Sequence, residues 1–110
     1  MHEHSETVEV RAFRGTRRTS VYREHVLPKQ DFVRILAAGA ARGLALLSSL
    51  DQHGPHELDK ASAKRLAEEA TDLRMSGELV ELDGDLVAVT EVARWCAHAS
   101  DDAWLRIEDP

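Results

Sequence analysis

Histidine and carboxylate residues gather between positions 51 and 57, where the sequence reads Asp-x-His-x-x-His-Glu. Zinc in proteins binds three or four converging nitrogen, sulfur or oxygen ligands. His53 and His56 supply two such ligands, and no second pair stands at a spacing that would complete the site. The Gly-Pro dipeptide between them is typical of a loop. We therefore expect a solvated loop with no metal and no other cofactor. A metal held by the two histidines remains the alternative.

Nucleophilic catalysis would need a reactive side chain beside a base. The only cysteine is Cys96, and His98 follows two positions later. On a helix these positions point about 200° apart, so the pair cannot act together. The adjacent acids at 68–69 and 101–102 are typical of a solvated surface, and the glycines are too isolated to form a phosphate-binding loop. We therefore predict that the protein is not an enzyme and that Cys96 is a buried thiol.

The charge of the chain is unevenly distributed. The formal net charge is −6, yet residues 10–29 carry six basic residues and one acid. Residues 51–110 carry fifteen acids and six bases, a local balance of −9. A chain this acidic is a poor nonspecific nucleic-acid binder, and its acidic half suits the basic surface of a partner protein.

Six residues are candidates for contact with such a partner, five of them acidic and one a tryptophan. They are Glu68, Glu69, Asp72, Glu81, Asp85 and Trp104. Complementary charge speeds encounter and favours the right partner. Trp104 has the opposite parity from Leu105 on a predicted strand, so it points away from the core, where an exposed tryptophan is a candidate binding anchor. The alternative is that the tail or a loop covers this ring.

Arginines at the tip of a predicted hairpin offer a second kind of site. Arg14, Arg17 and Arg18 could grip phosphates. No aromatic residues are interleaved with them and no recognition helix is apparent, so nucleic acid is the less favoured partner. Solvated charges that keep an edge strand from pairing with other chains explain these arginines equally well.

The elements that position these residues follow from hydrophobic periodicity. Residues 1–6 are predicted to be a disordered tail, and residues 7–110 to form one domain. The predicted elements are strands at 7–13 and 19–26, a helix from Pro28 to Gly43, a helix at 59–75 that Asp59 caps and Gly77 ends, and a strand at 103–107. The fold class is α+β: a small antiparallel sheet, made of the N-terminal hairpin and the C-terminal strand, packed against about three helices.

Two segments leave alternatives open. Leu44–Leu47 fits a buried strand or a further helical turn. Residues 78–99 fit either a hairpin around Asp83-Gly84 or a helix that Asp83 caps. We favour the helix, because apolar residues keep a helical period through His98.

The N-terminal residues indicate no export signal. Met-His-Glu-His-Ser-Glu contains neither the basic nor the apolar region of a signal peptide. No apolar run reaches the roughly 20 residues that span a bilayer. We therefore expect a cytoplasmic protein with no membrane partner.

The layout of the chain carries one resemblance. A strand hairpin, a helix that starts at a proline, a Leu-Leu-x-x-Leu-Asp segment at 46–51, two helices and a closing Trp-Leu-Arg-Ile strand follow one another between residues 7 and 108. This layout resembles that of small uncharacterised actinobacterial proteins, some of which are similar in style to the immunity proteins of bacterial toxin systems. The resemblance includes no residue-level motif and assigns no functional residue. It implies a protein that neutralises a basic toxin by binding it.

A non-catalytic protein-binding module, of the immunity or antitoxin type, is the function that these observations favour. The first alternative is a small regulatory protein that contacts nucleic acid through the hairpin arginines. The second is a structural homodimer.

Overall fold

The computed structural model of the chain describes residues 6–15, 21–52, 54–99 and 102–109. A strand pair, two helices, a short strand, three further helical segments and a last strand follow one another along these residues. The elements are β1 (Thr7–Arg14), β2 (Val21–Pro28), α1 (Lys29–Ala41), α2 (Ala45–Ser49), β3 (His56–Leu58), α3 (Lys60–Ser76), the 3₁₀-helix η1 (Val80–Leu82), α4 (Asp83–His98) and β4 (Ala103–Glu108).

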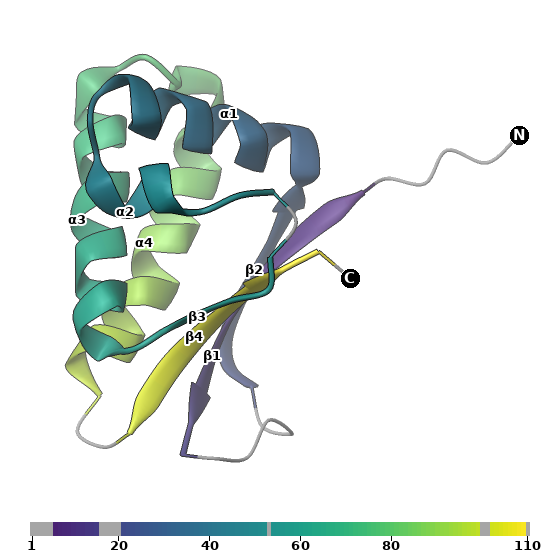
Figure 1. Ribbon diagram of the computed structural model, residues 1–110, viewed down its shortest axis with the longest axis vertical. Helices are drawn as coiled ribbons and strands as arrows, with labels where there is room; N and C mark the ends of the chain where they lie inside the picture. The colour runs from purple at the N-terminus through teal and green to yellow at the C-terminus, as the bar shows by residue number, and fades with distance from the viewer. Residues whose placement is uncertain (1–5, 16–20, 53, 100–101, 110) are drawn as a thin grey trace, which may run out of the picture.

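The four strands of the described residues form one antiparallel sheet in the order β2-β1-β4-β3 (Figure 1). The predicted hairpin and the predicted last strand are both present, and they pair so that Phe13 lies opposite Trp104. β3 is an additional strand, in a segment that the sequence analysis assigns to a loop, and its Leu58 lies opposite Leu105. The α+β fold class is confirmed, with one strand more than expected.

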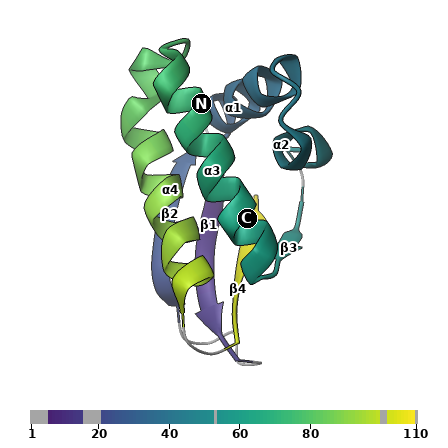
Figure 2. The same cartoon turned by 90° about the vertical axis from the view of Figure 1, so that its left-hand side faces the viewer.

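The helices lie on one face of the sheet. α3 and α4 run side by side in opposite directions in front of the strands, and α1 and α2 lie at one end of this layer (Figure 2). α4 packs mainly on β1 and β2, whereas α3 packs on β3 and β4. No described element covers the opposite face of the sheet (Figure 1).

Alternate residues of each strand point to the two faces of the sheet. The face under the helices, named the covered face, carries the polar residues Arg23, His25 and His56 at its margins. Its other residues are buried and apolar: Val8, Val10, Ala12, Leu27, Leu58, Ala103, Leu105 and Ile107. The other face, named the open face, consists mostly of charged and aromatic residues: Glu9, Arg11, Phe13, Glu24, Val26, Glu57, Trp104, Arg106 and Glu108. The predicted alternation of the last strand, with the odd-numbered residues inward, is confirmed.

α3 begins and ends where the sequence predicts. The Asp59 carboxylate accepts a hydrogen bond of 2.8 Å from the Ser62 backbone N–H, so Asp59 is the N-cap. Gly77 ends the helix at φ 76°, a left-handed conformation that glycine adopts without a steric penalty. Between them the helix buries an apolar stripe at helical spacing: Ala63, Leu66, Ala67, Ala70 and Leu73.

α1 and α2 are in close contact through a glycine. Pro28 ends β2, and α1 starts one residue later at Lys29. A Cβ atom on Gly39 would lie 2.6 Å from the Cβ of Leu47, so only glycine fits this helix crossing. Close contact with another helix is therefore the reason for a glycine inside α1. The Leu44–Leu47 alternative is resolved in favour of a helix, because α2 begins at Ala45.

The ambiguous segment from residue 78 onward forms a helix rather than a hairpin, as favoured. The predicted cap is wrong, however. η1 continues directly into α4, so Asp83 has helical dihedral angles (φ −56°, ψ −40°) instead of the extended backbone that an N-cap needs. Its carboxylate instead accepts a hydrogen bond of 3.0 Å from Arg74 Nε. Within the described residues, no helix is both long enough and apolar enough to cross a membrane.

Candidate functional site

Glu69 is the one predicted partner contact that the fold buries. Only 7% of it is exposed, and its two carboxylate oxygens accept hydrogen bonds from the backbone N–H groups of Leu46 (3.0 Å) and Leu47 (2.8 Å). These N–H groups belong to the first turn of α2, where no intrahelical acceptor exists. Glu69 therefore holds α2 against α3, and its carboxylate is inaccessible to a partner.

Three further predicted contacts, Asp72, Glu81 and Asp85, are paired within the protein. Asp72 accepts a hydrogen bond of 3.2 Å from Arg42, and Glu81 is ion-paired with Arg34. Hydrogen bonds from its own backbone N–H and from Arg34 lower the pKa of Glu81. Asp85 Oδ1 lies 2.8 Å from Nε2 of His25 on β2. Two of these carboxylates are thus paired with arginines, one in α1 and one directly after it, and the third is paired with a histidine of β2.

Glu68 differs from these four acids. It is exposed on the side of α3 turned away from the sheet, and it makes no ion pair with another described residue. The six predicted contacts therefore do not form one surface. Glu68 and Trp104 lie on opposite sides of the molecule, and the other four acids serve internal pairs.

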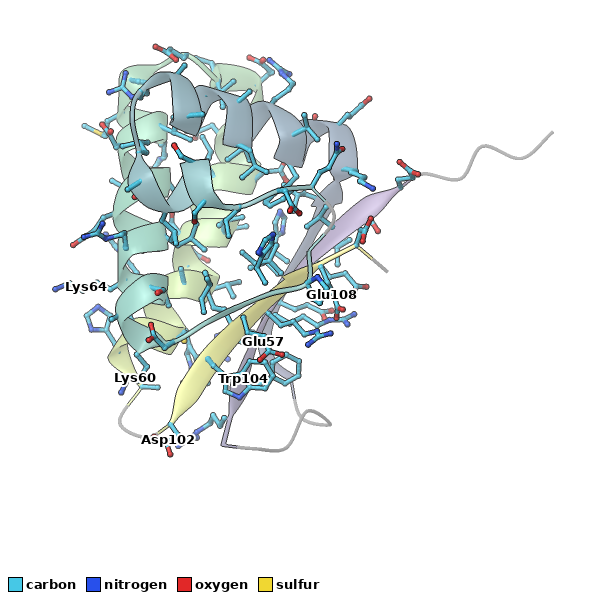
Figure 3. The ribbon with its side chains drawn as sticks, viewed as in Figure 1. Glu57, Lys60, Lys64, Asp102, Trp104 and Glu108 are labelled. Carbon is cyan, nitrogen blue, oxygen red and sulfur yellow. The ribbon has the colours of Figure 1, made fainter. Side chains whose placement is uncertain are left out.

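Trp104 lies on the open face, as its parity predicts. Its ring stacks on Phe13 with the ring centroids 4.7 Å apart and the planes 20° apart. Its indole N–H donates a hydrogen bond of 2.7 Å to the backbone oxygen of Gly15. Phe13 is buried beneath the Trp104 ring, whereas Trp104 remains partly exposed. The open face thus presents a rigid aromatic surface (Figure 3).

Beside the aromatic pair, each central strand of the open face carries an arginine between two glutamates. On β1, Arg11 is ion-paired with Glu9 (2.8 Å) and with Glu24 of β2 (2.9 Å).

On β4, Arg106 is ion-paired in the same way with Glu57 of β3 (2.7 Å) and with Glu108 (3.0 Å). The hydrogen bond to Glu108 and the charge of Glu108, followed by the charge of Glu57, raise the pKa of the Arg106 guanidinium. Each triad has one positive and two negative charges, so the two triads together bring four carboxylates and two guanidinium groups to this face.

The sheet register places like charges of the two triads opposite each other. Glu9 pairs with Glu108 across β1 and β4, and Arg11 pairs with Arg106. Directly opposite like charges destabilise a sheet, and the flanking opposite charges offset this. A cation bound over Glu9 and Glu108 would further relieve their repulsion.

A hollow of about 430 Å³ adjoins Trp104 at the start of β4. Its charged rim is formed by Asp59, Lys60 and Asp102. Figure 3 labels Lys60 and Asp102 near Trp104. Lys60 donates a hydrogen bond to the backbone oxygen of Ala99, and the Ser62 N–H lowers the pKa of Asp59, which stays ionised as the cap of α3. The hollow thus adds two carboxylates and one ammonium group beside the indole ring.

The other candidates from the sequence occupy separate places. Arg14 is exposed at the end of β1, whereas Arg17 and Arg18 lie outside the described residues, as does His53. His56 Nε2 lies 3.2 Å from Asp51 Oδ1. Among the described residues, no three histidine, cysteine or carboxylate side chains are grouped to hold a metal.

Cys96 is fully buried, as predicted, and burial raises its pKa to about 11.

Sequence reasoning missed most of the open face. The parity of the predicted strands at 7–13 and 103–107 could have grouped Glu9, Arg11 and Arg106 with Trp104. Glu57 could not be added, because its position depends on β3, which is three residues long and pairs only with the distant β4. No family model, curated protein or solved structure matches this chain.

Proposed function

We propose that this protein is a non-catalytic binding module whose open face binds a basic segment of a partner protein. The observation that carries the proposal is the combination of a partly exposed Trp104 with four carboxylates and two guanidinium groups on a sheet face that no described element covers. A neutralising role of the immunity or antitoxin type is one form of this proposal.

Arginine and lysine side chains fit both components of this face. A guanidinium or ammonium group is attracted to the face of a tryptophan ring by about 0.5–1 kcal/mol at an exposed site, and more when water is excluded. Carboxylates add charge-assisted hydrogen bonds, which are bidentate for arginine. Glu57 on β3, together with Asp59 and Asp102 beside the hollow, supplies such carboxylates around Trp104.

The charge of the open face also favours protein over nucleic acid. Aromatic rings on an open sheet can stack with bases, but the four glutamates of the two triads would repel the phosphates. Arg11 and Arg106, which could bind phosphates, are already paired with these glutamates. The same face that would attract a basic peptide would therefore disfavour a polynucleotide.

Titration with short peptides tests the proposal. We expect an octa-arginine peptide to shift the amide resonances of β1 and β4, and octa-glutamate to shift none of them. Glu57→Gln should weaken octa-arginine binding about threefold or more, since one carboxylate of the face is lost. The matched control is Glu91→Gln, which removes an exposed acid on α4 and should change the affinity less than twofold.

Three results would contradict the proposal. Shifts confined to α3 and α4 would move the site away from the sheet. Equal effects of Glu57→Gln and Glu91→Gln would show that binding depends only on the net charge of the protein. Binding of a single-stranded oligonucleotide that Arg14→Ala abolishes would favour the nucleic-acid alternative.

A further inference from the structure

A second hollow lies between α3 and α4, on the side of these helices turned away from the sheet. Its volume is about 360 Å³, and its lining includes the charged residues Lys64 and Glu68 of α3 and Arg94 of α4, with His98 beside them. The two helices are antiparallel, so the start of α3 lies beside the end of α4 (Figure 2). Figure 3 shows Lys64 pointing away from the sheet, opposite to Trp104.

The basic side chains of this hollow have no partner within the described part of the chain. Lys64, Arg94 and His98 make no hydrogen bond or ion pair to any described residue. Elsewhere nearly all described lysines and arginines are engaged. These are Arg11, Arg14, Arg23, Lys29, Arg34, Arg42, Lys60, Arg74 and Arg106. In a chain with 20 acids and 14 bases, unpaired cations around one hollow indicate a ligand of negative charge.

The floor of the hollow suits an apolar group. Three short side chains line it: Ala67, Thr71 and Ala97. The Thr71 hydroxyl donates its hydrogen to the backbone oxygen of Ala67, so that hydrogen is not available to a ligand. Glu68, the one acid of the hollow, disfavours a second negative charge on the ligand near it. The hollow therefore fits a ligand with one anionic end and an apolar body.

We propose that this hollow is a binding site for a small ligand that carries a phosphate or carboxylate group on an apolar body. Lys64 and Arg94 bind the anionic group from the two helices, with His98 beside them. The apolar body lies over Ala67 and Ala97. This site is on the opposite side of the helix layer from the open face, so it does not depend on the proposed function.

Three probes that share one ring and differ in charge test this site. They are phenyl phosphate, benzoate and benzamidine, each titrated into the protein while amide resonances are recorded. We expect phenyl phosphate to shift resonances of residues 64–71 and 94–98, and benzamidine to shift none of them. Phenyl phosphate binding tighter than benzoate would identify phosphate as the preferred group, and the reverse order would identify carboxylate.

Substitutions then test the two cations. Lys64→Ala and Arg94→Ala should each weaken binding of the preferred probe about five- to tenfold, since each removes one charge-assisted hydrogen bond. The matched control is Arg65→Ala, because Arg65 is an exposed arginine next to Lys64 that makes no described ion pair and does not line the hollow. Its effect should stay below twofold.

The same measurements can contradict the proposed binding site between α3 and α4. An equal loss in Arg65→Ala would show that only the general charge of α3 matters. Binding of benzamidine as strong as that of the anions would show that the charge of the hollow does not select its ligand. Shifts spread over the open face, or no shifts with either anion, would also contradict it.

Discussion

The two faces of the sheet use neighbouring residues of the same strands for different tasks. On β4, Leu105 is fully buried under the helices, while Trp104 and Arg106 on either side of it lie on the open face. Removing apolar area from water contributes about 25 cal/mol per Å², whereas ion pairs at a surface contribute about 0–1 kcal/mol. Stability therefore rests on the odd-numbered residues of β4, and the proposed recognition of a partner on the even-numbered ones. Substitutions one residue apart should separate the two properties.

Polar groups reflect the same division. Under the helices, the few buried polar side chains are bonded internally, as Glu69 is to α2 and as Thr90 is to the backbone oxygen of Leu86 (2.7 Å). On the open face the charged groups are paired with one another but remain in contact with water. A buried group that loses its partner costs more than an exposed one. Charge on the covered side thus specifies the fold, and charge on the open face can be varied with little loss of stability.

The largest effect is expected from Leu105→Ala. It removes a fully buried side chain from the covered face and should lower the free energy of unfolding by about 3 kcal/mol. Urea denaturation measures this loss. The affinity of the remaining folded protein for octa-arginine should stay within twofold. A loss below 1 kcal/mol would mean that the covered face contributes less to stability than its burial indicates.

Cys96 is a probe of how well the helices exclude water. Its pKa is about 11 in the folded protein and 9.0 when exposed on unfolding. The unfolded state thus loses the proton first, and stability falls as the pH rises from 9 to 11. Between pH 8 and 10.5, wild type should lose about 1–2 kcal/mol more than Cys96→Ala. Parallel pH profiles of the two proteins would contradict the raised pKa.

Trp104→Ala affects both properties, because the ring stacks on Phe13 and bonds to Gly15. We expect a stability loss of about 1–2 kcal/mol, from one aromatic pair and one hydrogen bond. Octa-arginine affinity should fall at least tenfold, as for an interface anchor. Trp104→Phe keeps the stack and should recover part of the affinity. An unchanged affinity in Trp104→Ala would remove this residue from the proposed site.

Arg106→Gln should weaken stability slightly and strengthen binding. The exposed ion pairs with Glu57 and Glu108 contribute less than about 1 kcal/mol. The two glutamates that are left without their arginine should raise the affinity for octa-arginine about two- to threefold at low salt. Calorimetry at two salt concentrations measures both quantities. A weaker affinity would show that Arg106, rather than its glutamates, contacts the peptide.

The smallest effect is expected from Glu68→Lys. Glu68 is exposed on α3, on the far side of the molecule from the open face, and it makes no described ion pair. Stability should change by less than about 0.5 kcal/mol and octa-arginine affinity by less than twofold. A large loss of octa-arginine affinity would indicate that a basic partner binds the acidic surface of the helices rather than the open face.

The elements that could be predicted are those whose signals are local. The capping carboxylate of Asp59, the terminating Gly77 and the alternation from Ala103 to Ile107 each lie within a few residues of the structure that they specify. Trp104 was correctly placed on the outward face by parity alone. Such features need no knowledge of what the segment packs against.

The features that were missed depend on distant partners. Glu69 has the sequence context of a solvated acid, and it is buried because the first turn of α2, more than 20 residues earlier, supplies its hydrogen-bond donors. β3 is too short for its own periodicity to show, and it exists through its pairing with β4. The local charge of −9 was likewise a poor guide to the acidic surface. Arg34 of α1 and Arg42 directly after it are ion-paired with two of the acids counted in that charge. The candidate site was thus only partly predictable.

The central position of β4 has a consequence for biosynthesis. β4 lies between β1 and β3, yet it follows every other described element in the chain. While the protein is being synthesised, the inner edge of the hairpin and the whole of β3 lack a partner until residues 103–108 emerge. Unpaired strand edges invite association with other chains, and pairings this distant in sequence form slowly. A translation product that stops before residue 103 would therefore be left as an aggregation-prone hairpin with loosely held helices, a substrate for chaperones and proteases.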